Sequence, residues 1–491
     1  MRIAFISTEV FPFAKTGGLA DVSYSYPKAL AKAGHEVCIF MPAYNTIDRE
    51  KYGVKLNKAP LVIKMGQEEK YSAILSSDYI PGVQTYFIDY ERYFHRDGLY
   101  GDYYNNAYSD NAERFAFFSK AVIHGLKEIN FIPDIIHCND WQTGLIPVYL
   151  KTIYRNDKFF KRTAIVLTVH NAGYQGLFPG DKLDMREFNG SDFKFENIEH
   201  SYGISYLKGG VLYSDIITTV SRKYAEEIQT PEFGFEMAYV FGMVSDRLYG
   251  IPNAVDTEEW DPSTDKYLPY RYSAENIADK NKCKAELQKR MGLTVKPQIP
   301  LLGAISRLTF QKGMDVLADT LELLLQDEDF QFILVGSGDQ RIADRFAYLQ
   351  KMFRQRVGIS LEYTEELGHL AEAGLDIYIM PSRYEPCGLN QMYSLRYGTV
   401  PVVRATGGLD DIIEEWNDKY KTGNGFKFNN LTHEEIYNTI RKVVKKYKEK
   451  NIWKIIQKNG MLGLQGNYSW DDAVREYEKI YAAALENIKN T

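Results

Sequence analysis

Short apolar runs alternate with amphipathic stretches along this chain, and their rhythm predicts its fold class. Runs rich in Ile, Val and Phe that end in polar residues are typical of buried strands. Between them, apolar residues recur at helical spacing, as at 111–129, while 52–90 alternates apolar and polar residues and predicts antiparallel hairpins. In the first half, the predicted strands lie at 3–7, 36–41, 134–138, 163–169 and 215–220.

The same rhythm restarts after 249–260, where Asp, Pro and Ser accumulate. Strands that alternate with helices indicate β/α units and parallel sheets. We therefore expect an α/β protein with two doubly wound, Rossmann-like domains, at 1–252 and 253–470, followed by a C-terminal helix in 471–491. The predicted strands of the second half lie at 300–306, 330–335, 359–363, 376–381 and 400–403.

The segment 376–408 predicts a strand, a polar loop, a helix and a second strand. Pro386 suits the first helical position, where its missing N–H costs nothing. The N–H groups of Cys387, Gly388 and Leu389 would then lack intrahelical partners and offer a docking place for a phosphate or a sugar hydroxyl. The alternative is a surface loop with an ordinary helix start, and this stretch alone does not separate the two.

Polar or charged side chains follow the predicted strands in both halves. In an open α/β sheet, the carboxyl ends of the strands form the edge at which ligands bind. Two such edges that face each other predict a site in a cleft between the domains. The residues concerned are Glu9, Lys15, Asp140, His170 and Asn253 in the first half, and Arg307, Lys312, Glu385 and Gly407-Gly408 in the second.

Two of these segments are suited to binding phosphate. Lys15-Thr16-Gly17-Gly18 lets the backbone approach a phosphate closely and adds a positive charge. Arg307 and Lys312 lie at a strand end and a helix start, where they can clamp a diphosphate. The chain has no Walker A motif, and Gly336-Ser337-Gly338 begins a dinucleotide fingerprint that Arg at position 341 breaks. Taken singly, each charge also fits a solvated surface position.

Composition excludes several classes of protein. The formal net charge of -6 argues against a general nucleic-acid binder. The four Cys are scattered without a C-x-x-C pair, which indicates a reducing compartment and neither a zinc site nor a disulfide framework. We find no signal-peptide pattern and no apolar run of about 18 residues, so a cytoplasmic protein without membrane contact is expected. Asp327-Glu328-Asp329 matches D-x-D but precedes a strand, at the wrong edge for a metal site, so we expect neither a metal nor a cofactor.

Several motifs, in this order over nearly the whole chain, together resemble bacterial glycogen synthase and plant starch synthase. They are KTGGLADV at 15–22, His170-Asn171, Asn253-Ala254-Val255-Asp256, Ser306-Arg307-Leu308, Gln311-Lys312-Gly313, Glu385-Pro386-Cys387-Gly388-Leu389 and Ala405-Thr406-Gly407-Gly408-Leu409. The resemblance implies the GT-B architecture, with a deep interdomain cleft and a last helix that returns to the first domain. It also implies retaining transfer of glucose from a nucleotide-glucose, usually ADP-glucose, to the 4-OH at the non-reducing end of an α-1,4-glucan such as glycogen.

The catalytic residues that the resemblance implies are Glu385, His170, Arg307 and Lys312. Arg307 and Lys312 would hold the diphosphate and stabilise its charge as it leaves, and His170 would lie close to the reacting carbon. Retention leaves two roles open for Glu385. It is either the nucleophile of a covalent intermediate or the group that positions the transferred glucose, and we favour the second. In that case the acceptor attacks from the face of the departing diphosphate, which acts as the base.

The resemblance also implies a set of substrate-binding residues. Asp140 and Asn253 would line the sugar pocket, and Tyr363 would stack on the adenine. At position 390 the chain has Asn where many bacterial relatives are expected to have Thr, so side-chain contacts to phosphate are expected to differ. The full set is Lys15, Thr16, Gly18, Glu9, Asp21, Asp140, Trp141, Asn171, Asn253, Tyr363, Cys387, Gly388, Leu389 and Asn390.

Two other classes stay open at this point. One is another GT-B enzyme, such as a sucrose-type synthase or a phosphorylase, of which the latter would need pyridoxal phosphate. The other is a non-catalytic glucan-binding protein, which would not need Lys15, Arg307 and Lys312 together. The residues do not decide between ADP-glucose and UDP-glucose, and they leave the oligomeric state, regulation and acceptor length open.

Overall fold

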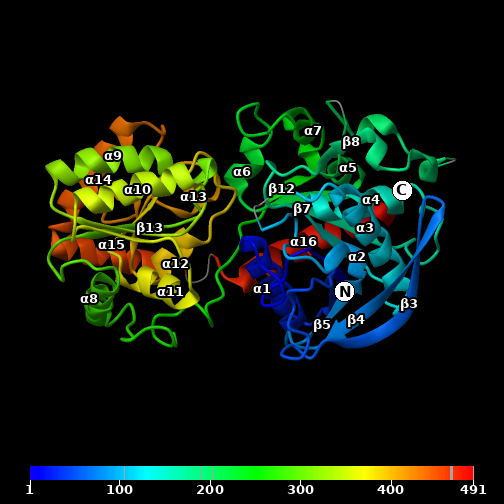
Figure 1. Ribbon diagram of the computed structural model, residues 1–491, viewed down its shortest axis with the longest axis horizontal. Coiled ribbons are helices and arrows are strands. Elements are labelled where there is room, and N and C mark those ends of the chain that lie inside the picture. The colour runs from blue at the N-terminus through cyan, green and yellow to red at the C-terminus, as the bar shows by residue number, and fades with distance from the viewer. Residues whose placement is uncertain (104–105, 190, 202, 465–467, 490–491) are drawn as a thin grey trace. The chain divides into compact units, whose positions relative to one another are not determined.

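The chain folds into two compact units, which Figure 1 shows in a computed structural model. The structure describes residues 1–103, 106–189, 191–201, 203–464 and 468–489. The first unit comprises Met1–Val220, Ala225–Ile251 and the chain from Trp470, and the second comprises Ser221–Tyr224 and Pro252–Ser469. Each unit is built on a largely parallel sheet, so the predicted α/β class with two such domains is confirmed. No helix in the described ranges is long and apolar enough to cross a membrane.

The first unit contains a nine-stranded sheet in the order β12-β11-β7-β6-β1-β2-β5-β4-β3. β4 pairs antiparallel with β3 and β5, while the other neighbours are parallel. The hairpin predicted within 52–90 is thus β3–β4, but β5 from the same segment also joins β2 in parallel. The strands are β1 (Arg2–Ile6), β2 (Glu36–Pro42), β3 (Lys55–Met65), β4 (Glu68–Ser77), β5 (Val83–Asp89), β6 (Ile135–Asn139), β7 (Ala164–Val169), β11 (Ile216–Thr219) and β12 (Leu248–Gly250).

Helices and a small second sheet complete this unit. The small sheet is antiparallel and three-stranded, in the order β8 (Leu177–Pro179), β10 (Gly203–Ser205) and β9 (Glu199–His200). α6 (Arg222–Glu227) spans the boundary between the units. The other helices are α1 (Gly18–Lys32), α2 (Glu91–Phe94), α3 (Asn111–Glu128), α4 (Leu145–Lys151), α5 (Tyr206–Tyr213), α7 (Ala238–Met243) and α16 (Trp470–Lys489).

The C-terminal helix α16 is fastened to the first unit by buried hydroxyl groups. The Tyr481 hydroxyl lies 2.8 Å from that of Tyr26 on α1 and 2.7 Å from Nδ1 of His137 on β6. The other ring nitrogen of His137 lies 2.6 Å from Oγ1 of Thr168 on β7. Burial lowers the pKa of His137 to about 3, so its ring is neutral. The last helix therefore supplies a hydrogen-bond partner to His137 on β6, a central strand of the nine-stranded sheet, and to Tyr26 on α1.

The second unit is a six-stranded parallel sheet in the order β15-β14-β13-β16-β17-β18. Figure 1 shows α9, α10 and α14 on one of its faces and α8, α11 and α12 on the other. Its strands are β13 (Leu301–Ile305), β14 (Gln331–Val335), β15 (Val357–Ser360), β16 (Ile377–Met380), β17 (Val400–Arg404) and β18 (Phe426–Phe428). Its helices are α8 (Lys280–Arg290), α9 (Met314–Asp327), α10 (Gln340–Met352), α11 (Glu365–Gly374), α12 (Asn390–Arg396), α13 (Gly407–Ile412), α14 (His433–Tyr447) and α15 (Lys450–Gly463).

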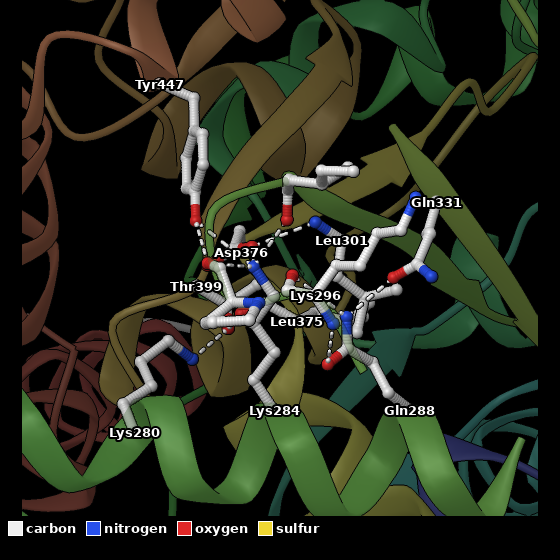
Figure 2. A network of polar contacts seen from close by, with 12 residues as sticks. Lys280, Lys284, Gln288, Lys296, Leu301, Gln331, Leu375, Asp376, Thr399 and Tyr447 are labelled. Atoms are coloured by element: carbon white, nitrogen blue, oxygen red, sulfur yellow. Dashed lines mark hydrogen bonds and ion pairs between the residues drawn. The ribbon is translucent and has the colours of Figure 1, made fainter. Parts of the chain in front are cut away.

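A buried ion pair fastens α8 to the amino ends of β13 and β16 (Figure 2). Nζ of Lys284 lies 2.6 Å from Oδ2 of Asp376, and only 1% and 8% of the two side chains are exposed. The same ammonium donates to Ile299 O at 2.6 Å and contacts the Tyr447 hydroxyl at 3.1 Å. Asp376 also accepts from Leu301 N at 2.8 Å. Both charges are therefore surrounded by hydrogen-bonding partners, which a buried ion pair needs to be tolerated.

The predicted start of the helix after β16 is wrong. α12 begins at Asn390, so Pro386 does not occupy a first helical position. Gly388 has a φ of 75°, a left-handed conformation that no helical residue adopts. The Gln391 side chain donates to the carbonyls of Cys387 and Gly388, both at 2.8 Å, and so holds the intervening loop. The amides at 387–389 lie in this loop and not in the first turn of the helix.

Candidate active site

In the first unit, the candidate residues lie at the carboxyl ends of three neighbouring strands, β1, β6 and β7. Glu9 follows β1 and is 4% exposed. Its Oε2 accepts from Thr16 N at 2.5 Å and Gly17 N at 3.1 Å. Its Oε1 accepts from the hydroxyls of Thr16 at 2.7 Å and Tyr100 at 2.9 Å. Glu9 therefore holds the glycine-rich loop in place, and both of its carboxylate oxygens accept hydrogen bonds.

The glycine-rich loop presents Lys15 in front of a helix. α1 begins at Gly18 and is 15 residues long, so the partial positive charge of its N-terminus lies behind the loop. Nζ of Lys15 lies 2.8 Å from Oδ1 of Asp21 in the first turn, and both side chains are partly exposed. An anion at this place would meet a cation and the partial positive charge of the helix N-terminus, with Asp21 orienting the lysine.

Asp140 follows β6 in a strained conformation. Its φ of 57° lies in the left-handed region, which is costly for a residue with a Cβ. Its Oδ1 accepts from His170 N at 2.7 Å, so the carboxyl group holds the segment that follows β7. Burial raises the pKa of Asp140 from 3.8 to about 7, although hydrogen bonds from the backbone of His170 and Asn171 oppose that rise.

The raised pKa of Asp140 predicts a pH dependence of stability. Between about pH 4 and pH 7 the folded carboxyl binds a proton that the unfolded one has lost, so the free energy of unfolding should fall as pH rises through this window. Three pKa units correspond to at most about 4 kcal/mol. We expect Asp140→Asn to remove this dependence, measured as urea midpoints of variant and parent from pH 4 to 8. Asp78→Asn, at an exposed position of the same unit, is the control. If the urea midpoints of Asp140→Asn and of the parent changed with pH in parallel, the raised pKa of Asp140 would be contradicted.

His170, Asn171 and Trp141 differ in the contacts that their side chains make. Nε2 of His170 lies 2.9 Å from Oδ1 of Asn139, and burial lowers the pKa of His170 to about 3. Asn171 accepts from Gly173 N at 2.9 Å and so closes a turn. The Trp141 ring packs edge-on against Phe115, with ring centroids 5.0 Å apart. Trp141 thus packs within the first unit, and the His170 ring is held by Asn139 through one of its two nitrogens.

In the second unit, three loops converge at the carboxyl ends of β13, β16 and β17. Nζ of Lys312 lies 2.5 Å from Oε2 of Glu385, and the Ser382 hydroxyl donates to the same oxygen at 3.0 Å. Glu385 is 5% exposed. Its ion pair therefore lies at the edge of water and is little screened.

Arg307 lies near this pair in the sequence but differs in its surroundings. It is an exposed residue directly after β13 and Ser306. Within the described ranges Arg307 makes no ion pair, whereas Lys312 is bound to Glu385. Gly313, with a φ of 65°, ends the short 3-10 helix that carries Lys312 and begins α9. The loop after β13 thus presents one uncompensated guanidinium group and one ammonium that is held by a carboxylate.

Glycines let the loops after β16 and β17 touch. Gly408 N donates to Glu385 O at 3.1 Å. A Cβ on Gly407 would lie 2.0 Å from that same carbonyl, so the close approach requires glycine. Asn390 Nδ2 donates to Ile305 O at 2.9 Å, which joins the start of α12 to the end of β13. The amide nitrogen of the Asn390 side chain therefore binds a backbone carbonyl group of the same unit.

The remaining predicted residues lie around this loop. Asn253 hydrogen-bonds to the Cys387 thiol, whose pKa burial raises to about 12. Cys387 is 4% exposed and is thus a buried neutral thiol. Tyr363 is 47% exposed and lies in the loop between β15 and α11, because β15 ends at Ser360 and not at 363 as predicted. Its hydroxyl donates to Oε2 of Glu365 at 3.3 Å.

Two residues that hold the candidate site, Ser382 and Asn139, were missed in the sequence. Ser382 lies three residues before Glu385, and Asn139 directly precedes Asp140. Both types are common at strand ends, so only their hydrogen-bond partners reveal their role. The D-x-D segment, in contrast, contacts helix α14. Asp327 accepts from the Tyr437 hydroxyl at 2.5 Å, and Glu328 pairs with Arg441 at 2.8 Å.

Comparison with known proteins defines the class. Residues 2–242 match the family model of the starch synthase catalytic domain, and residues 288–459 match that of glycosyl transferases group 1. The catalytic domain of starch synthase IV from Arabidopsis thaliana, bound to ADP and acarbose, is similar over 99% of both chains, with a TM-score of 0.89 and 30% identity. A sucrose-phosphate synthase from Thermosynechococcus elongatus shares the fold, with a TM-score of 0.60 and 18% identity over 99% of both chains. These matches define a two-domain glycosyltransferase.

Sequence relatives give the family. A glycogen synthase from Koribacter versatilis is 44% identical over 99% of both chains, and one from Pseudothermotoga lettingae is 41% identical over the same shares. The chain belongs to the glycogen synthase family of glucosyltransferases. The predictions of this family, of a glucosyltransferase and of the fold class are thereby confirmed.

Proposed function

We propose that this chain elongates glycogen by transferring glucose from ADP-glucose to the 4-OH at the non-reducing end of an α-1,4-glucan, with retention and without a metal ion. The observation that carries the proposal is the Lys312–Glu385–Ser382 cluster beside the loop 387–389, a cation and a carboxylate set among backbone amides. A similar chain, the starch synthase IV domain, is bound to ADP and to acarbose, which supports a nucleoside diphosphate and a glucan as ligands.

In this proposal, the donor diphosphate is held by cations. Lys15 at the N-terminus of α1, Arg307 and Lys312 supply the positive charge. Such groups stabilise the charge that develops on a leaving diphosphate without the need for a metal. The exposed ring of Tyr363 stacks on the adenine.

The glucosyl group lies against Glu385 and His170. Since Lys312 and Ser382 both bind Oε2 of Glu385, lone pairs of that oxygen are engaged and its nucleophilicity is reduced. We therefore assign Glu385 to positioning the sugar. The bond from C1 to the diphosphate breaks, the acceptor O4 bonds to C1 on the same face, and the acceptor proton passes to the departing phosphate oxygen. A glucosyl adduct trapped on Glu385 would instead make it the nucleophile.

The first test is release of nucleoside diphosphate from ADP-glucose and, separately, from UDP-glucose, each with and without glycogen and with a chelator present. We expect release from ADP-glucose that depends on glycogen. Release from UDP-glucose alone would correct the donor, and release that requires a divalent cation would correct the metal-free mechanism. A folded protein that releases neither diphosphate would contradict the proposed reaction and favour a glucan-binding protein.

We also propose the cytoplasm as the compartment. All four cysteines are free and buried, which suits a reducing environment.

A further inference from the structure

A hydrogen bond in the first unit determines which nitrogen of His170 carries a proton. Asn139, the last residue of β6, is 1% exposed. Its Nδ2 donates to Ile6 O, at the end of the neighbouring strand β1, at 2.9 Å. A backbone carbonyl only accepts hydrogen bonds, so the amide cannot be turned around without placing two acceptors against each other. The orientation of the Asn139 amide is therefore fixed by its donor side.

With its nitrogen on Ile6, the Asn139 amide turns its oxygen to His170. This Oδ1 lies 2.9 Å from Nε2 of the ring. Because an amide oxygen only accepts, Nε2 must carry the hydrogen. Burial lowers the pKa of His170 to about 3, so the ring is neutral and Nδ1 bears the lone pair. In the part of the chain that the structure describes, no group donates to this Nδ1.

The backbone on both sides of this hydrogen bond is also held. Asp140, next to Asn139, accepts from His170 N at 2.7 Å, so consecutive residues bind the backbone and the ring of the same histidine. The Thr143 hydroxyl donates to Asn139 O at 2.9 Å and closes the turn after β6. The titratable groups next to His170 are Asp140 and, within the sheet, His137. Apart from Asn139, none of these contacts involves a ring nitrogen of His170.

We propose that Asn139 is a positioning residue: it holds His170 as the Nε2–H tautomer and so keeps Nδ1 an acceptor toward the transferred sugar. The other tautomer would turn an N–H toward the same place and would repel a hydroxyl hydrogen. The inference rests on the proposed function, since His170 borders the reacting sugar in that reaction. The tautomer itself is a property of the protein alone and can be measured without any turnover.

The first measurement is a long-range ¹H–¹⁵N spectrum of the full chain labelled in histidine, with His170→Gln identifying the signals. We expect a neutral ring protonated at Nε2 throughout pH 5.5–8. In Asn139→Leu we expect a mixture of the two neutral tautomers, because the amide oxygen is gone. A parent protein protonated at Nδ1 would overturn the proposal, and so would an Asn139→Leu spectrum identical to that of the parent.

The second measurement connects the tautomer with turnover. We expect Asn139→Leu to lower kcat at least about tenfold, since a histidine in the wrong tautomer loses its function, while the donor KM changes less. Thr143→Val is the matched control, because it removes a buried hydrogen bond of the same turn without touching the His170 ring. It should preserve both the spectrum and kcat. Equal losses of kcat in the two variants would make Asn139 merely structural.

Asn139→Asp keeps the size of the side chain and provides a separate test if the leucine variant does not fold. A carboxylate beside Nε2 stabilises the imidazolium, so the pKa of His170 should rise and both nitrogens should carry protons at the acidic end of the range. We expect kcat to fall as pH decreases, with this limb shifted upward by at least about one pH unit relative to the parent. An unshifted profile would overturn the proposal. Absence of glucosyl transfer in the parent, with the expected tautomer present, would overturn the proposed function and leave the tautomer assignment intact.

Discussion

Replacing Lys312 with alanine is expected to lower kcat by about 10²–10³-fold, the usual cost of removing one preorganised group that stabilises developing charge. Nζ of Lys312 lies 2.5 Å from Oε2 of Glu385. The variant loses a cation for the diphosphate and, at the same time, the ion-pair partner of Glu385. Rates with saturating donor and glycogen, together with the melting temperature, measure the two effects separately. Arg307→Ala, at an exposed position, should lower turnover with even less effect on stability.

Lys446→Ala is the matched control for this experiment. Its side chain is 13% exposed, against 17% for Lys312, and it pairs with Asp418 at 2.9 Å in the same unit. We expect the control to keep full activity. If Lys312→Ala lost activity only in proportion to folded protein, or if Lys446→Ala lost it equally, Lys312 would be structural.

The largest effect on stability is expected from Asp376→Ala. Lys284 would remain buried with carbonyl groups and a hydroxyl around it but without a counter-charge. Breaking a buried ion pair by removing one partner costs about 3–5 kcal/mol, because the remaining charge is uncompensated. We expect a loss of this size in the urea-induced unfolding of the second unit. Activity per folded molecule should change little, since Asp376 lies at the amino end of β16 and Glu385 follows its carboxyl end.

The comparison for Asp376 is an ion pair of similar geometry on the surface. Glu366→Ala removes the partner of Arg290, which lies 2.6 Å away with both side chains exposed. Exposed pairs contribute little to stability, so this variant should unfold with the parent. A small effect of Asp376→Ala, equal to that of Glu366→Ala, would mean that Lys284 loses its proton or reaches water when its partner is removed.

Local patterns were sufficient to place many of the candidate residues at the ends of strands. Glu9 follows β1, His170 follows β7 and Glu385 follows β16, because an apolar run that ends in a polar residue marks both the strand and its end. The start of α12 was misplaced for a local reason. Pro386 suits a first helical turn, but Gly388 adopts a left-handed conformation that the helix cannot contain.

The hydrogen bonds that orient the candidate site depend on which strands are neighbours. Asn139 binds both Ile6 and His170 because β6 lies between β1 and β7, an order that no local pattern encodes. The same holds for Ser382. Its hydroxyl supports Glu385 together with Lys312, and these two residues are far apart in the sequence and meet only in the folded unit. Sequence motifs thus predicted the candidate residues at the strand ends, whereas the residues that orient them became visible only with the sheet order.

The position of α16 in the first unit has a consequence for protein synthesis. A ribosome makes the chain from its N-terminus, so β1, β6 and β7 have left the exit tunnel long before Tyr481 is added. Until then the hydroxyl of Tyr26 and the ring of His137 lack the partner that α16 supplies. The second unit, in contrast, has all of its strands and helices before α16 is made. The part of the chain that is made first is therefore completed last, and a nascent chain stopped before Trp470 should expose an unfinished first unit to chaperones beside a finished second one.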